Sequence, residues 1–220
     1  MRGALLSFIA GYVDTAVFVG LFGLFTAHVT GNFVLIGSEL VHRSGEVWPK
    51  LLAFPAFIAA VAITVKIVEA RERRAKPAVP VLLYIEAALL VLAFGAAALE
   101  QPARASDASA LIAGMLAAGA MGLQNAMMRI ELASLPSTTV MTMNVTQSVI
   151  DVVTLLSQRA DPAKRDEARK RFAHMWPQIL AFTVGAAAGA SGFALAGFAA
   201  LLVPSVLCVA LGGLWQQART

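Results

Sequence analysis

The chain has 220 residues, of which 59% are hydrophobic and 14% are charged, and its formal net charge is +4. Soluble domains contain about 45–50% apolar and about 25% charged residues, so this composition excludes an ordinary soluble domain. The mean hydropathy is +0.75, and several apolar runs approach the ~20 residues that cross a bilayer. We therefore predict an integral multi-pass membrane protein.

The apolar runs can be placed in chain order. The first, residues 4–26, follows Arg2 as a signal peptide would, but Asp14 interrupts it and no convincing small-residue cleavage site is present, so we interpret it as a mature transmembrane segment. The other predicted spans are residues 49–67, 79–98, 109–130, 177–197 and 199–215, with two shorter apolar segments at 30–42 and 141–156.

The positive net charge does not indicate nucleic-acid binding. Basic residues gather in two short segments that we expect to be loops, residues 66–76 and 159–171. Both segments also contain acidic residues, which makes them poor ligands for a nucleic-acid backbone. Basic loops beside apolar spans are instead the usual mark of the cytoplasmic face. We expect anionic lipid headgroups to be their neighbours, and no nucleic-acid partner.

Short motifs recur in the same order in the two halves of the chain. The most specific match is WPKLLAF (48–54) with WPQILAF (176–182). Because all the matches occur in the same order, chance is a poor explanation for them. We therefore predict two membrane repeats, residues 1–105 and 106–220, within one integral membrane domain. The matched segments are GYVD (11–14) with GLQN (122–125), HVTGN (28–32) with VMTMN (140–144), and WPKLLAF (48–54) with WPQILAF (176–182).

The charge pattern decides between two topologies. If the two short segments do not cross the membrane, six crossings place Arg2, both basic segments and Arg219 on one face, as the positive-inside rule requires. Three crossings per repeat would invert one half relative to the other, an arrangement typical of secondary transporters. We predict an all-α polytopic membrane protein with about six transmembrane helices, two short re-entrant or broken helices and cytoplasmic termini.

Polar residues precede each short segment. Non-helical backbone at membrane depth is tolerated only where protein or a water-filled cavity shields it, and a half-helix that starts there directs free N–H groups inward. Two such starts predict a solute site near the midplane. Alternatively, Thr and Asn join helices while Gly31 permits close packing. The candidate substrate-binding residues are Thr30, Gly31, Asn32, Gln124, Asn125, Arg129, Thr139, Thr142 and Asn144.

Ionisable residues inside or beside the spans are a second group of candidates. Such residues are costly in a bilayer and are functional by default, so we take Asp14, His28 and Glu86 as candidates for proton coupling. The alternatives remain open: a buried acid paired with a basic or amide side chain, and a histidine that only hydrogen-bonds at an interface. Arg129 is equally consistent with an anchor that extends to the membrane surface.

Other motifs predict no chemistry. The chain lacks a nucleophile motif, zinc-ligand spacing, a P-loop and a dinucleotide fingerprint, so we expect neither an enzyme nor a bound metal or cofactor. The methionines near residues 127–143 indicate adaptable packing rather than copper ligation. The small residues at 185–192 indicate tight helix packing, within the chain or between the subunits of a homo-oligomer.

Four motifs together resemble the YoaK-like family of small bacterial multi-pass membrane proteins, whose function is unknown. They are AGYVD (10–14), HVTGN (28–32), GLQNAMMR (122–129) and STTVMT (137–142). Where the family pattern in the second repeat has a glycine, this chain has Met143. The resemblance implies a location in the bacterial inner membrane and supplies no substrate.

From these features we expect a small secondary transporter or permease surrounded by membrane lipids. Its solute would be small and polar or anionic, and would bind between the two half-helix starts. The alternative is a non-transporting membrane protein, such as an assembly partner or a lipid-binding or sensing module. In that case Thr30 and Asn32 only join helices.

Overall fold

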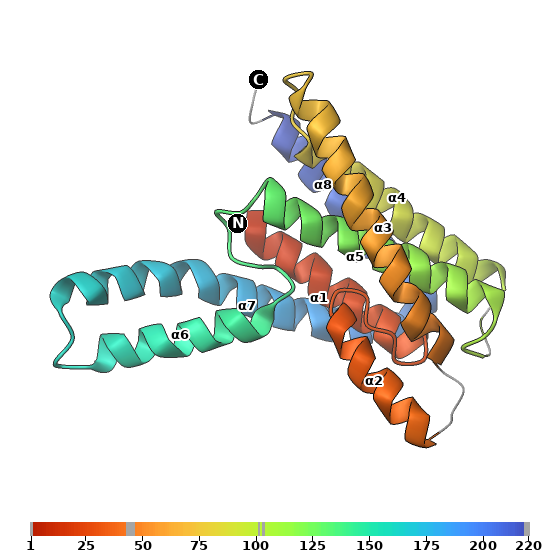
Figure 1. The fold of residues 1–220 in the computed structure, drawn as a ribbon, viewed down its shortest axis with the longest axis horizontal. Coiled ribbons are helices and arrows are strands. Elements are labelled where there is room, and N and C mark those ends of the chain that lie inside the picture. The colour runs from red at the N-terminus through yellow and green to blue at the C-terminus, as the bar shows by residue number, and fades with distance from the viewer. Residues whose placement is uncertain (1, 43–46, 101, 103, 218–220) are drawn as a thin grey trace.

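The structure is a computed structural model that describes residues 2–42, 47–100, 102 and 104–217. Within these residues all regular structure is helical (Figure 1), which confirms the all-α prediction. The elements in chain order are α1 (Arg2–Gly20), α2 (Val29–His42), α3 (Val47–Glu72), α4 (Val79–Leu99), α5 (Ala108–Ile130), α6 (Met141–Leu156), α7 (Pro162–Ala196), the 3-10 helix η1 (Gly197–Leu201) and α8 (Leu202–Gln217).

The multi-pass membrane character is confirmed by helix length and hydropathy. In the described part of the chain, five segments are long and apolar enough to cross a bilayer: α1, α3, α4, α5 and the continuous stretch Pro162–Gln217. The last contains α7 and α8, and the chain turns between them at Gly197, whose φ of +56° is readily available to glycine. Large apolar side chains such as Ile58, Leu180 and Val206 face outward, as a lipid-covered surface requires.

Helices from the two halves of the chain pack against each other. α1 lies on α7, α5 lies on α3, and α4 packs between α5 and α8. The α1–α7 contact is close because glycines line it: a Cβ on Gly11 would lie 2.3 Å from the Phe182 carbonyl oxygen, and one on Gly189 would lie 2.3 Å from the Tyr12 carbonyl oxygen. The small residues of α7 therefore serve packing within the chain.

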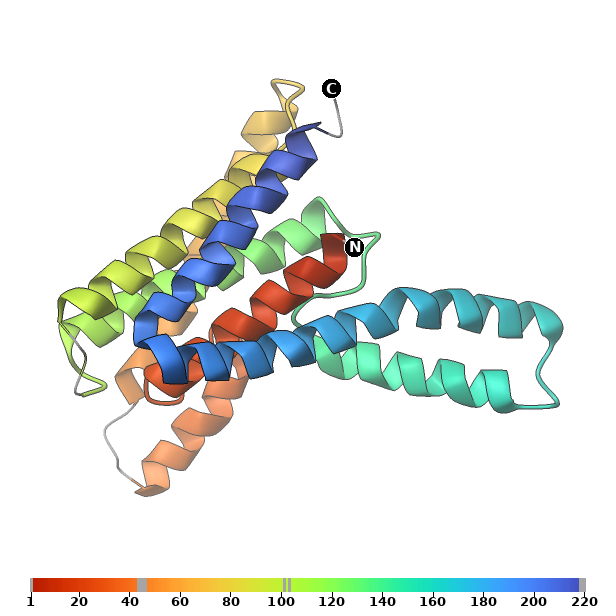
Figure 2. The same cartoon turned by 180° about the vertical axis from the view of Figure 1, so that it is seen from behind.

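Each of the two short helices begins after an irregular connection. We name residues 21–28, between α1 and α2, the first crossover segment, and residues 131–140, between α5 and α6, the second crossover segment. The bounds of α2 and α6 agree closely with the predicted short segments. From its start, α6 extends away from the other helices and forms a projecting hairpin with the first half of α7 (Figures 1 and 2).

The prediction of loops at the two basic segments is wrong in large part, since α3 continues to Glu72 and only residues 159–161 of the second segment precede α7. From Pro162 onward this segment is the beginning of α7, which continues without a break through the predicted span. Asp161 caps the helix by accepting a hydrogen bond from the Ala163 N–H at 3.0 Å, and proline suits the first helical position. Alanine, arginine, lysine and glutamate are good helix formers, so a charged segment continues the helix beyond the apolar run.

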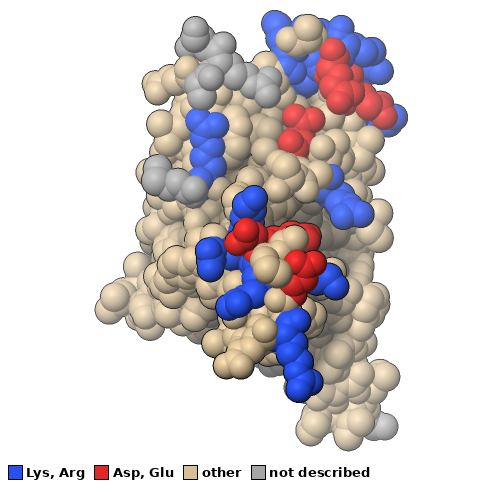
Figure 3. All heavy atoms as spheres, turned by 90° about the vertical axis from the view of Figure 1, so that its left-hand side faces the viewer, with Lys and Arg blue, Asp and Glu red and all other residues tan. Residues whose placement is uncertain are grey.

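Charged side chains gather at two places on the face shown in Figure 3. One is the tip of the α6–α7 hairpin, and the other is the upper end near the α3–α4 connection. The start of α1 and the end of α8 also lie together, because Arg2 donates to the Leu214 carbonyl at 3.2 Å and stacks over the Trp215 ring. The two described chain ends therefore share one end of the molecule.

Candidate functional site at the crossover segments

Asp14 anchors the first crossover segment to α1. The residue is 4% exposed. Oδ1 accepts hydrogen bonds from the backbone N–H groups of Thr26 and Ala27, both at 2.7 Å, and from the Thr26 hydroxyl at 3.1 Å. Oδ2 lies 2.6 Å from Nδ1 of His28. The carboxylate thus supplies hydrogen-bond partners to backbone donors that have no helical partner.

Asn32 closes the same segment from the first turn of α2. It is fully buried. Its Nδ2 donates to the Phe25 carbonyl at 2.8 Å, and its Oδ1 accepts from the Phe25 N–H at 3.0 Å. Both ends of the amide are therefore engaged by one backbone residue. Asn32, which we predicted to bind the solute, instead holds the irregular backbone in place.

The second crossover segment repeats part of this arrangement with neutral groups. Asn125, which the repeat matches to Asp14, accepts from the Thr139 hydroxyl at 2.6 Å and donates to the Met121 carbonyl at 2.9 Å. Asn144 donates to the Ser137 carbonyl at 2.7 Å. Like Asn32, it bonds the carbonyl of the residue seven positions before it in the chain.

Gln124 ties the second crossover segment to the first helix. Its Nε2 donates to the Leu6 carbonyl of α1 and to the Thr138 hydroxyl, both at 3.0 Å. Its Oε1 is buried and has no hydrogen-bond partner among the described residues. This residue therefore connects α1, α5 and the second crossover segment.

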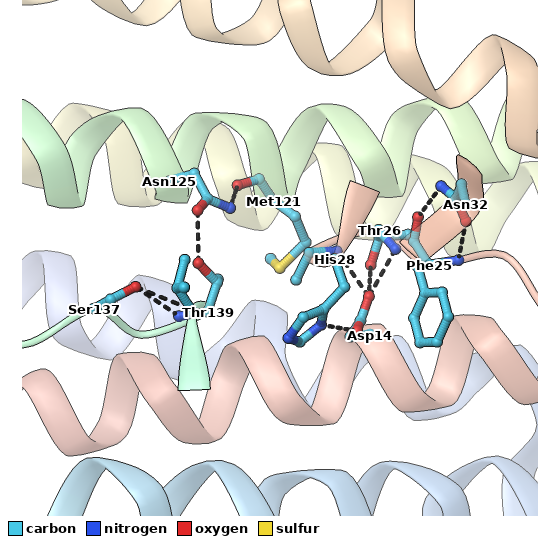
Figure 4. Close-up of polar contacts among 11 residues, drawn as sticks. Asp14, Phe25, Thr26, His28, Asn32, Met121, Asn125, Ser137 and Thr139 are labelled. Carbon is cyan, nitrogen blue, oxygen red and sulfur yellow. Dashed lines mark hydrogen bonds and ion pairs between the residues drawn. The ribbon is translucent and has the colours of Figure 1, made fainter. Parts of the chain in front are cut away.

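His28 links the two crossover segments. Besides its contact with Asp14, its ring interacts with the backbone of Thr139 and packs edge-on against Phe182, with ring centroids 5.6 Å apart. Figure 4 shows the two polar clusters between α1 and α5, with His28 between Asp14 and Thr139. The ring is 35% exposed, so it is the least enclosed member of its cluster. The two crossover segments thus meet through a titratable side chain.

A cavity of about 690 Å³ lies beside the second crossover segment. Three predicted substrate-binding residues line it: Asn125, Arg129 and Asn144. Arg129 makes no ion pair with any described residue. The remaining lining residues are Phe57, Val61, Ala126, Met128, Ile130, Ala133, Leu135, Pro136, Ser137, Val140, Met143, Gln147 and Met175. A mostly apolar hollow with a few polar groups has the form of a small-molecule site.

Other predicted site residues lie away from this cavity. Thr30 and Thr142 are exposed on the surfaces of α2 and α6, and Thr139 is buried beneath its crossover backbone. Gly31 packs against the Phe25 ring, where an added Cβ would come within 2.9 Å of ring carbon Cδ2. The structure thus gathers part of the predicted set at the cavity and places the rest in packing or at the surface.

Glu86 belongs to a different contact, between α4 and α8. It is fully buried, and the Cys208 thiol of α8 is the polar group that faces it. Neither carboxyl oxygen makes a hydrogen bond of ordinary geometry within the described residues. An ionised carboxylate in such surroundings is costly, so Glu86 remains a functional candidate separate from the crossover segments.

Comparison with known protein families gives a family match for this chain. The family described as protein of unknown function (DUF1275) matches residues 3–214. The chain belongs to this family. Comparisons with curated proteins and with solved structures found no match. The DUF1275 description names no activity, so a function for this member has to be argued from its site.

Sequence reasoning missed two charge pairs of this DUF1275 protein. Lys50 of α3 is 2% exposed, donates to the Phe22 carbonyl at 2.8 Å and lies 3.8 Å from Glu39. Asp151 of α6 is fully buried and accepts from Arg171 of α7 at 2.7 Å. A signal was present: Glu39 and Asp151 each follow the asparagine of their repeat motif by seven residues. Each pair joins a short helix to the next long one.

Among the described residues no group of three or more His, Cys, Asp or Glu side chains could hold a metal ion. The polar groups that hold the two crossover segments in the described hydrogen bonds are amides, hydroxyls, the Asp14 carboxylate and the His28 imidazole. Such groups suit hydrogen bonding to a polar solute or the transfer of a proton between His28 and Asp14.

Proposed function

We propose that the protein is a small secondary transporter of the bacterial inner membrane for a small polar or anionic solute. The observation that carries this proposal is the cavity beside the second crossover segment and the start of α6, with Asn125, Arg129 and Asn144 in its wall. Interrupted helices that surround a solute site are typical of secondary transporters. We also propose, from the four motifs quoted above, that the chain is similar to the YoaK-like family.

The packing of the helices supports an inverted repeat. In the repeat, α1 corresponds to α5 and α3 corresponds to α7. The α1–α7 contact therefore corresponds to the α5–α3 contact, and both contacts occur. Gly11 and Gly122 occupy matched positions, and each lies against the backbone of the helix from the other half. We propose that residues 1–105 and 106–220 are the two repeats. Their crossings would be α1, α3, α4, α5, α7 and α8, and α2 and α6 would be half-helices.

The same arrangement supports one cytoplasmic face. In Figure 1 the start of α1, the end of α8, the α3–α4 connection and the tip of the α6–α7 hairpin lie towards the left and top. The end of α2 and the start of α5 lie towards the bottom and right. We propose that the first group, which carries the basic segments, faces the cytoplasm, as the positive-inside rule requires.

Asp14 and His28 are the preferred residues for proton coupling. Their 2.6 Å contact lies where the two crossover segments meet, so a change of protonation there would alter the contact between the repeats. Glu86 is the second candidate, because it is buried and has no ion pair with any described residue.

The first experiment is a thermal-shift screen of the purified protein against small anions and polar metabolites at several pH values. A solute that binds the folded state at a hundredfold excess over Kd stabilises it by about 2.7 kcal/mol. We expect a stabilising solute whose effect is lost in Arg129→Gln. The matched control is Arg74→Gln, which removes an exposed arginine at the α3–α4 connection and should retain the full shift.

Hits are then tested for uptake by proteoliposomes against protein-free vesicles. Uptake that depends on Arg129 supports the transporter. Binding without any uptake, under inward and outward gradients of solute and protons, contradicts it.

One observation favours the second candidate, a non-transporting membrane protein. The polar groups of Asp14 and Asn32 are engaged by the first crossover backbone, as they would be in a purely structural role. Under this alternative an assembly partner or lipid would bind elsewhere, and Arg129→Gln would leave every thermal shift unchanged.

A further inference from the structure

A second cavity, of about 400 Å³, lies between the second crossover segment and α7. It adjoins the larger cavity because Leu135, Pro136 and Met175 line both. Its other lining residues are Ser134, Lys170, Arg171 and His174. No described residue that lines either cavity is acidic, and the basic side chains gather in the smaller one.

The positive charge in this region is only partly compensated. Arg171 is paired with the buried Asp151 and with Glu167. Lys170 has no ion pair with a described residue, and the same holds for Arg129 in the larger cavity. His174 places Nδ1 3.3 Å from the Lys170 carbonyl, which leaves its other ring nitrogen available. Cations that line a recess and are not paired with acids attract anions.

The larger cavity has a different character. Its wall is mainly apolar, with Phe57 and Val61 from α3, Met128 and Ile130 from α5, and Val140 from the second crossover segment. An inorganic anion would fill little of this volume and would meet few polar partners there. An alkyl chain would gain from burial against these side chains, and methionine adapts readily to its shape.

We propose that the two adjoining cavities bind an amphiphilic anion, with its anionic head at Lys170 and His174 and its apolar chain in the larger cavity. This inference rests on the proposed solute site for the larger cavity and names the class of solute that it takes. A free alkyl phosphate and an acidic phospholipid share this chemistry, and the test distinguishes them.

The test is equilibrium binding to the full-length protein in nanodiscs of phosphatidylcholine. Decyl phosphate, inorganic phosphate and the neutral decyl maltoside are titrated while the unfolding temperature is followed. We expect decyl phosphate to stabilise the protein, and the other two to have no effect at equal concentration. Losing a charged hydrogen bond weakens binding by about tenfold or more, so Lys170→Gln should raise the apparent Kd for decyl phosphate by that factor.

Three variants make this result specific. Lys164→Gln removes another exposed lysine of the same helix and should bind as the wild type does. His174→Gln should weaken binding in the same direction as Lys170→Gln. Ala133→Leu narrows the larger cavity without changing charge, and should weaken binding of decyl phosphate more than that of hexyl phosphate.

A further arm replaces part of the phosphatidylcholine with phosphatidylglycerol. Competition with decyl phosphate identifies the bilayer as the source of the ligand, and lack of competition identifies a free amphiphile; both support the site. Equal stabilisation by inorganic phosphate, no stabilisation by decyl phosphate, or wild-type binding by Lys170→Gln would overturn it. Binding needs no transport, so a protein that binds decyl phosphate but moves no solute contradicts only the transporter.

Discussion

The two crossover segments carry matching motifs but are held in different ways. The first is anchored by the charged Asp14, which has four polar contacts, and by Asn32, whose amide is fully engaged. The second is held by neutral Asn125 and by Asn144, and both residues also line a cavity. The comparison indicates that the polar groups of the first copy are used to support backbone, whereas those of the second copy also face a cavity.

The largest expected effect comes from removing the charged anchor. Asp14→Ala would leave the backbone N–H groups of Thr26 and Ala27 buried without acceptors, at a cost of about 3–5 kcal/mol. We expect little folded protein on size exclusion and a much lower unfolding temperature. Asn125→Ala is the matched change in the second segment and should be milder. Equal losses in the two variants would refute the proposed difference in support.

The two matched asparagines provide the next comparison. Asn32→Ala removes two buried hydrogen bonds to Phe25, and should lower the free energy of unfolding by about 2–3 kcal/mol. Asn144→Ala removes one backbone bond beside a cavity, and should cost about 1 kcal/mol. Thermal unfolding in the same detergent measures both. A larger loss for Asn144→Ala would reverse the assignment of roles.

The link between the segments can be tested through His28. His28→Ala removes the contact with Asp14 and the interaction with Thr139, at a cost of about 1 kcal/mol because the ring is partly exposed. Hydrogen exchange should then increase in residues 25–28 and also in residues 137–140. Faster exchange in the first segment alone would show that the two segments are not coupled through this ring.

The smallest expected effects concern the position at which the motifs differ. Met143→Gly introduces a poor helix former on an exposed face of α6, and should cost about 1 kcal/mol or less. Gly31→Ala, its counterpart, places a Cβ against the Phe25 ring and should lower the unfolding temperature further. If Met143→Gly proves more harmful, side-chain contacts of Met143 matter more than its place in the helix.

Local sequence was sufficient for the short helices. Their predicted bounds, residues 30–42 and 141–156, differ by at most one residue at either end from Val29–His42 and Met141–Leu156. Apolar runs that follow polar, helix-interrupting motifs mark such boundaries directly. The start of α7 was missed because a hydropathy pattern detects only the apolar part of a helix. The charged first turns of α7 are helical but not apolar.

Sequence also identified most of the polar residues at the crossover segments without their roles. Asp14, His28, Asn32 and Asn125 were all candidates, and all lie in the hydrogen-bonded clusters. Whether an amide faces a ligand or a backbone carbonyl depends on the path of a nearby irregular segment. No residue pattern specifies that path.

By itself, the sequence determined a helical membrane protein, the positions of its apolar segments and the polar motifs that interrupt them, because hydropathy and local helix preference act over a few residues. The tertiary structure alone decided that Asp14 and Asn32 hold backbone, that His28 reaches Thr139, and that Arg129 and Asn144 line one cavity. Those outcomes depend on how α1, α5 and α7 pack, and contacts between distant parts of a chain form only when the helices assemble.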